Sequence, residues 1–228
     1  MTLDELKTLP VPDTTRTHQP VPHHEIVAAL TETLSFRHIS VVRQEFAATT
    51  DGAKMFGVMD LDYEFTGARF SIALRNSNNK AFRLGLVAGY RVFCCDNMSF
   101  SGDFQPVLAK HSKKLNITNL ISIGVDSIQR NFDPLKRTIS DWRANQLSDD
   151  DAKLVMYEAY VRGGLDAPNL LKETDKLYFE PQYPEFEERT LYSLSNAFTS
   201  AFKELKPFQQ FNATAKLPQF LNRYWRPF

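Results

Sequence analysis

The chain has 228 residues, of which 43% are hydrophobic and 12% aromatic, enough apolar material for one sizeable core. Its 27 Lys and Arg residues balance its 27 Asp and Glu residues, so total charge gives no general attraction to nucleic acid or to an anionic membrane. No run approaches the roughly 18 apolar residues of a membrane span, and the adjacent pair Cys94 and Cys95 is badly placed to form a disulfide, which is typical of a reducing cytoplasm.

The first 22 residues are predicted to form an extended N-terminal arm. Pro10, Pro12, Pro20 and Pro22 each remove a backbone donor and disfavour helix at the preceding position. Residues 23–228 are predicted to form a single α+β domain. It opens with a helix of about three turns, in which apolar residues recur at helical spacing from Ile26 to Leu34.

Residues 39–97 alternate between apolar and polar, which predicts an antiparallel β-meander of about four strands near 39–49, 53–65, 68–76 and 82–95. Asp51-Gly52 and Thr66-Gly67 are the turn signals. If both are two-residue turns, Arg43 lies opposite Asp60 and Glu64 opposite Arg69. One face then carries the apolar residues Val42, Phe46, Met55, Met59, Leu61, Tyr63, Phe65, Phe70, Ile72 and Leu74. We expect helices to cover this face, and the opposite face to be wet or to hold a ligand.

Several helices are predicted after the sheet. An apolar seam from Ile121 to Trp142 indicates a long helix that Pro134 kinks or divides. Ser148-Asp149-Asp150-Asp151 resembles the start of a second helix that ends at Gly163-Gly164. A third, near residues 190–204, buries Leu191, Leu194, Phe198 and Phe202. Because the seam has more apolar positions than one covering helix needs, it also predicts a homo-oligomer.

The residues with catalytic or metal-binding chemistry are better explained by structural roles. Asp60, Asp62 and Glu64 share one strand face, but cross-strand ion pairs explain them better than a metal does. His18, His23 and His24 lack a matching ligand set and are expected to be solvated. Cys94 and Cys95 are expected to be inert, partly buried thiols. Since the chain also lacks GxGxxG, P-loop and GxSxG motifs, we expect no enzyme activity, catalytic residue, metal or cofactor.

The stretch from Arg75 to Arg83 is a polar loop with three cations, three amides and no acid. Cations and amides on a loop satisfy phosphate oxygens. Together with later basic residues, including His111, it could form one positive surface, and the predicted nucleic-acid contacts are Arg75, Asn78, Lys80, Arg83, Arg91, Lys110, Lys113 and Lys114. Phe82, Tyr90, Phe93 and Phe100 would add stacking platforms if exposed, although at strand spacing they are more often core. The competing interpretation is a solvated loop that prevents pairing at the sheet edge.

Four segments carry a family resemblance, and they read LSFRHISVVRQEF, FGVMDLDY, RFSIALRNSNNKAFRLGLVAGYRVFCCDNMSFSGDF and RTLYSLSNAFTSAFKEL. They resemble an uncharacterised family of phage, plasmid and bacterial proteins, a domain of unknown function that implies no catalytic residue. The order of elements is also similar to that of RecT-like single-strand annealing recombinases, in which a short helix, a meander and a following helix line a DNA groove. That likeness is at the level of the fold.

These observations favour a non-enzymatic protein that binds single-stranded nucleic acid, with single-strand DNA annealing in a phage or mobile-element context as its expected role. The alternative is a protein-binding module of a mobile element that modulates a host defence protein, through the arm and the helical seam. Expected partners are therefore a single strand, a second copy of the chain, or a host protein, and no membrane.

Overall fold

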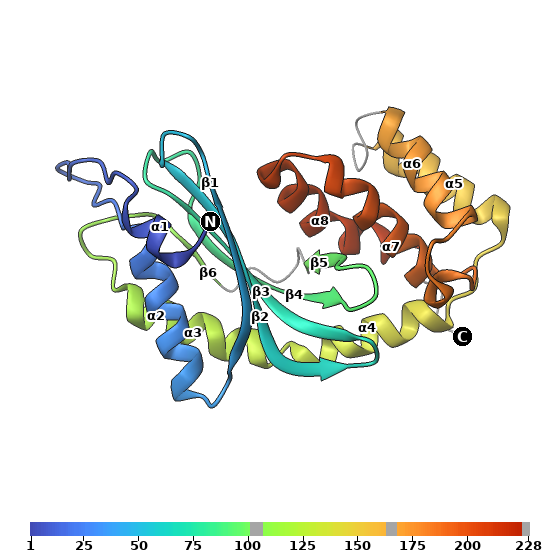
Figure 1. The fold of residues 1–228 in the computed structure, drawn as a ribbon, viewed down its shortest axis with the longest axis horizontal. Helices are drawn as coiled ribbons and strands as arrows, with labels where there is room; N and C mark the ends of the chain where they lie inside the picture. The colour runs from blue at the N-terminus through green and yellow to red at the C-terminus, as the bar shows by residue number, and fades with distance from the viewer. Residues whose placement is uncertain (101–106, 163–167, 225–228) are drawn as a thin grey trace. The chain divides into compact units, whose positions relative to one another are not determined.

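The computed structural model describes residues 1–100, 107–162 and 168–224 (Figure 1). They form an α+β fold, as predicted. The chain packs into two compact units: unit 1 comprises residues 1–90 and 104–132, and unit 2 comprises residues 91–103 and 133–228. That residues 23–228 form one domain stays a prediction. Among the described residues, no helix is both long and apolar enough to cross a membrane.

The sheet has six strands where about four were predicted. The first five pair in chain order, while the sixth pairs antiparallel with β4. The strands are β1 (Val41–Ala48), β2 (Lys54–Phe65), β3 (Ala68–Ser77), β4 (Leu84–Val92), β5 (Met98–Phe100) and β6 (Val107–Ala109). The two additional strands, β5 and β6, have only three residues each, too few for an alternating pattern to show in the sequence.

The predicted opposite pairs of the meander are confirmed, but the pairing of β2 with β3 shifts register between Asp60 and Glu64, so that Asp60 lies opposite Ser71. Arg43 pairs with Asp60, and Glu64 pairs with Arg69. Thr66 and Gly67 form the second turn, both with positive φ, between the paired ends of β2 and β3. The first connection is longer than predicted, because β1 ends at Ala48 and β2 begins at Lys54. The paired residues remain centred on Asp51-Gly52, so β1 and β2 keep the predicted pairing.

Burial differs from the prediction on both faces of the sheet. On the face predicted to be core, most side chains are buried, but Val42 and Tyr63 are exposed. On the other face, Phe56, Val58 and Asp60 are buried, so the middle of β2 is shielded from solvent on both faces. Asp60 accepts a hydrogen bond from the hydroxyl of Ser71 at 2.7 Å, which satisfies part of its buried carboxylate.

Unit 1 also contains three helices: α1 (Leu3–Lys7), α2 (His23–Phe36) and α3 (Ile117–Gln129). The short α1 corrects the prediction of a wholly extended arm. Thr2 and Glu5 form a capping box there, in which each side chain accepts from the other's backbone N–H. Leu6 is buried, and α1 packs on α2, which also packs on α3. The arm therefore docks on its own unit.

Unit 2 holds β5 and most of the C-terminal helices, which are α4 (Phe132–Ala144, its first residue in unit 1), α5 (Asp149–Val161), α6 (Pro168–Phe179), α7 (Leu191–Ala201) and α8 (Pro207–Leu221). The predicted starts at Ser148 and Thr190 are confirmed, since each side chain caps a backbone N–H. The four predicted apolar residues of the third helix are buried. Gly163-Gly164 lies outside the described residues, and α6 and α8 were not predicted.

The apolar seam is divided into two helices, as the sequence allowed. Helix α3 ends at Gln129 and α4 begins at Phe132, with Pro134 in the first turn of α4. Ile121, Val125, Ile128, Ile139 and Trp142 are buried within the chain. They therefore offer no apolar surface to a second copy, which removes the basis of the predicted homo-oligomer.

Candidate functional site

A pocket of about 620 Å³ in unit 1 is the candidate site. Three segments that lie far apart in the sequence line it: the arm, the loop between β3 and β4, and the residues after β6. We call it the loop pocket, and its lining residues are Thr17, His18, Ser77, Lys80, Ala81, Phe82, Arg83, Lys110, His111 and Ser112.

Buried amides fasten the arm beside this pocket. The side chain of Asn76 donates to Val21 O at 3.0 Å, and the side chain of Asn78 accepts from Val21 N, also at 3.0 Å. Both asparagines are almost fully buried. Because a buried backbone group without a partner costs free energy, these two hydrogen bonds hold the arm in place at Val21.

Two histidines of the arm region are buried, which corrects the expectation that they are solvated. His23 Nε2 lies 2.9 Å from Gly52 O, and its Nδ1 lies 2.9 Å from the amide nitrogen of Asn76. Since the amide donates and the carbonyl accepts, the neutral ring satisfies both contacts. Burial lowers the pKa of His23 and favours the same neutral form.

His18 lies between the two other segments of the pocket. Its Nδ1 is 3.0 Å from His111 O, and its Nε2 is 2.9 Å from Asn78 O. The ring of His18 also stacks on that of His111, with centroids 5.6 Å apart and an interplanar angle of 8°. One side chain of the arm thus joins the β3–β4 loop to the segment after β6.

His111 is buried, and among the described residues neither of its ring nitrogens has a hydrogen-bond partner. Burial, assisted by repulsion from His18 and His23, lowers its pKa to about 4. His111 is therefore neutral at physiological pH and does not contribute the positive charge that the sequence suggested.

The charge of the loop pocket comes from Lys80, Arg83 and Lys110, which are all exposed. Among the lining residues that the structure describes, none is acidic. The hydroxyls of Thr17 and Ser112 add neutral donors, whereas the buried hydroxyl of Ser77 already donates to the side chain of Asn79. Three cations and two hydroxyls without a competing carboxylate suit an anion with several acceptor oxygens, such as a phosphate group.

Phe82 gives the pocket an aromatic wall. Its ring is partly exposed, and the guanidinium carbon of Arg75 lies 5.4 Å from the ring centroid. Burial lowers the pKa of Arg75, which sits behind the ring and does not line the pocket. An aromatic ring supported by a cation is a surface on which a base can stack.

The structure thus places the predicted contact residues in different environments. It brings Lys80, Arg83 and Lys110 together, while Lys113 and Lys114 are exposed just beyond Ser112. For two residues the structure corrects the predicted contact with nucleic acid, because their side chains are buried. Asn78 binds the arm, and Arg91 in unit 2 pairs with Asp96 at 3.8 Å.

The stacking residues and the arm also differ from the prediction. Tyr90 and Phe100 are buried, whereas Phe93 is exposed but belongs to unit 2. Sequence reasoning missed Thr17 and His18, because nothing in the sequence of an extended arm indicates that it lines a pocket.

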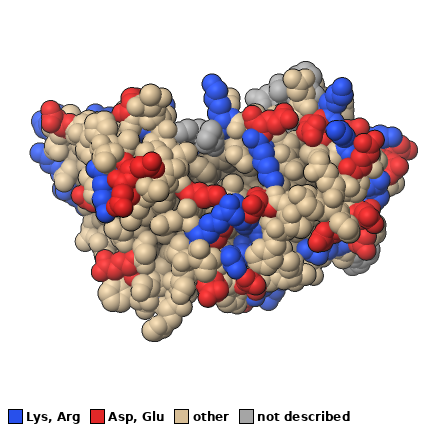
Figure 2. Space-filling view, in the orientation of Figure 1, with Lys and Arg blue, Asp and Glu red and all other residues tan. Residues whose placement is uncertain are grey.

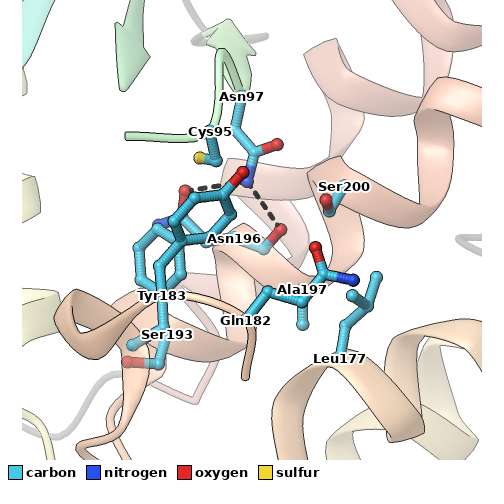
Figure 3. Close-up of a pocket in the computed structure, with 10 residues that line it drawn as sticks. Cys95, Asn97, Leu177, Gln182, Tyr183, Ser193, Asn196, Ala197 and Ser200 are labelled. Carbon is cyan, nitrogen blue, oxygen red and sulfur yellow. Dashed lines mark hydrogen bonds between the residues drawn. The ribbon is translucent and has the colours of Figure 1, made fainter. Parts of the chain in front are cut away.

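A second pocket, in unit 2, is too small for a ligand (Figure 3). Its volume is about 20 Å³, roughly the space of one water molecule. Asn97 points at Asn196 and donates from its side chain to the backbone O of Asn196 at 3.0 Å. Cys95 lines this pocket, and burial raises the pKa of its thiol to about 12, while burial also raises the pKa of Cys94. Neither thiol has the lowered pKa of a nucleophile.

Within the described part of the chain, no three His, Cys, Asp or Glu side chains group as metal ligands would. The loop pocket is therefore the site with the clearest binding chemistry. Comparison of the chain with protein-family models, with curated proteins and with solved structures found no match, so the candidate site is defined by its own geometry alone.

Proposed function

We propose that this protein binds single-stranded nucleic acid, with one nucleotide held in the loop pocket. The observation that carries the proposal is the convergence of Lys80, Arg83 and Lys110, from two distant segments, around a cavity without an acidic lining residue among those described. Three positive side chains brought this close repel one another, and an anionic ligand relieves that repulsion.

The size and surroundings of the pocket favour a strand over a free ion. Its volume of about 620 Å³ lies within the range of roughly 300–1,000 Å³ that is usual for small organic ligands, which leaves room for a sugar and a base. Lys113 and Lys114 lie exposed just after the pocket and suit neighbouring phosphates. Phe82 would stack a base, which an unpaired strand can present more easily than a duplex.

The distribution of charge supports a local site. Figure 2 shows Lys and Arg side chains interspersed with Asp and Glu side chains on the face in view. With 27 charges of each sign, the chain as a whole does not attract polyanions. We therefore expect binding of a few phosphates, with single-strand annealing in a mobile-element context as the broader role that the resemblance to RecT-like proteins implies.

The test is a titration of labelled oligothymidylate at several salt concentrations. Each phosphate neutralised on a single strand contributes about 0.7 to the slope of log K against log salt. Changing Lys80, Arg83 and Lys110 together to Gln should therefore reduce that slope by about 2 and weaken binding at low salt. These side chains are exposed, so the fold should persist.

A charge-matched control separates the pocket from net charge. Lys172, Lys176 and Lys216 are exposed in unit 2, and changing them to Gln removes the same total charge. This control should bind like the parent. Absence of binding by the parent at low salt would refute the proposed function, and equal losses in the two triple variants would reject the loop pocket as the site.

One observation favours the alternative, a protein-binding module. Leu154, Tyr157 and Val161 are 52%, 60% and 59% exposed, and their spacing places them along one side of α5. A row of exposed apolar side chains is typical of a protein-binding surface. If α5 binds a second copy, sedimentation at micromolar concentration should show an oligomer that Tyr157→Lys dissociates, and a monomeric parent would exclude that partner.

A further inference from the structure

His18 makes two contacts that a neutral imidazole cannot satisfy together. His111 O and Asn78 O are both carbonyl oxygens, and a carbonyl oxygen only accepts hydrogen bonds. Both bonds therefore form only when both ring nitrogens carry a hydrogen, which is the imidazolium form. His23 provides the internal contrast, because it faces one donor and one acceptor and is satisfied while neutral.

These two bonds connect the segments that carry the cations of the loop pocket. Asn78 lies two residues before Lys80, and His111 directly follows Lys110. Because His18 is only 7% exposed, its bonds are shielded from water. When both bonds are present, the β3–β4 loop and the segment after β6 are held together, and so are Lys80 and Lys110. When one bond is lost, the distance between these two cations is less restrained.

The charged residues that line the loop pocket together with His18 are all cations, namely Lys80, Arg83 and Lys110. His111 stacks on His18 but stays neutral, since burial lowers its pKa to about 4, and burial likewise lowers the pKa of His23. Among the described lining residues there is no carboxylate to favour the imidazolium. A bound phosphate would supply the missing negative charge.

We propose that His18 is a positioning residue of the loop pocket, and that binding of a phosphate-bearing strand there is coupled to the uptake of a proton by its imidazole. This inference rests on the proposed function. By linkage, a ligand that favours the protonated form binds more tightly when protons are more abundant. Affinity should therefore fall as the pH rises, by up to about tenfold for each pH unit.

The probe is oligothymidylate with hydroxyl ends and a label that does not titrate, because its phosphodiesters and bases keep their charge between about pH 5 and pH 8. In that interval histidine is the side chain that ordinarily changes charge. Calorimetry in two buffers with different ionisation enthalpies would then count the protons taken up on binding. The parent should take up a fraction of one proton that varies with pH.

Two variants assign the proton. His18→Gln retains a donor but cannot become charged, so it should bind more weakly at low pH, lose the pH dependence and take up no proton. His38→Gln removes an exposed imidazole that does not line the loop pocket, so it should keep both the pH dependence and the proton uptake. Circular dichroism and thermal unfolding would check that each variant folds, and if His18→Gln does not, proton uptake by the parent remains the test.

The results separate this inference from the function on which it rests. A parent that binds the strand with no proton uptake, or a His18→Gln variant with the pH profile of the parent, would overturn the role of His18 and leave the proposed function intact. No binding by the parent at low pH and low salt would instead overturn the proposed function.

Discussion

A single methyl group at Gly57 should strain the centre of the sheet. Gly57 pairs with Phe46 on β1 and with Leu74 on β3. A Cβ at this position would lie 2.6 Å from Cδ1 and 2.9 Å from Cε1 of Phe46, and 3.1 Å from Cδ2 of Leu74. Carbon atoms prefer separations of about 3.5–4.0 Å, so the ring would have to move by about 1 Å, and Phe46 is only 6% exposed.

Gly57→Ala should therefore lower the free energy of unfolding by about 1–3 kcal/mol, the usual cost of overpacking. Urea unfolding followed by far-UV circular dichroism would measure the change. Phe46→Ala removes both ring atoms in conflict, so the double variant should lose less stability than the two single variants added together, with a coupling of about 1 kcal/mol or more. A Gly57→Ala variant within about 0.5 kcal/mol of the parent, or strict additivity, would refute the reasoning.

The same experiment tests whether the chain is one cooperative domain. Trp142 is buried in unit 2, so its fluorescence reports on that unit. If residues 23–228 unfold as one domain, Gly57→Ala should shift the fluorescence and circular-dichroism transitions equally. A shift in circular dichroism alone would contradict the single-domain prediction.

Three further predictions concern buried groups. Cys94 and Cys95 should react slowly with a thiol reagent in the folded protein and rapidly after denaturation, because burial raises the pKa of both thiols. Replacing both by Ala should preserve the binding of single-stranded nucleic acid. Arg91→Gln should lower the free energy of unfolding by about 1–3 kcal/mol without changing the salt dependence of binding, since the buried guanidinium pairs with Asp96 and not with a ligand. The free energy of unfolding should fall as the pH falls from 6.5 toward 4. In this range the imidazole of residue 111 is protonated in the unfolded chain, whereas buried His111, with a pKa of about 4, stays neutral in the folded protein. His111→Gln should therefore reduce the loss of stability in thermal unfolding measured at the two pH values.

Local sequence patterns determined much of the fold. The alternation through β2 and β3, with Gly67 at the turn, was sufficient to place Glu64 opposite Arg69. Ser148 marked a helix start, because a capping hydroxyl acts on a backbone N–H only three residues away. Such signals are short in range, so a single sequence carries them directly.

The candidate site depended on contacts that have no local pattern. Lys110 lines the same pocket as Lys80 because the three residues of β6 pair with β4, and a strand that short leaves no periodicity in the sequence. His18 bonds to residues 60 and 93 positions away in the chain. The sequence by itself determined the pairing of β1 with β2, the turn between β2 and β3, the helix start at Ser148 and the cation-rich loop. Only the tertiary structure decided which cations face a common cavity and which polar side chains are buried, because burial depends on partners that the folded chain brings from distant positions.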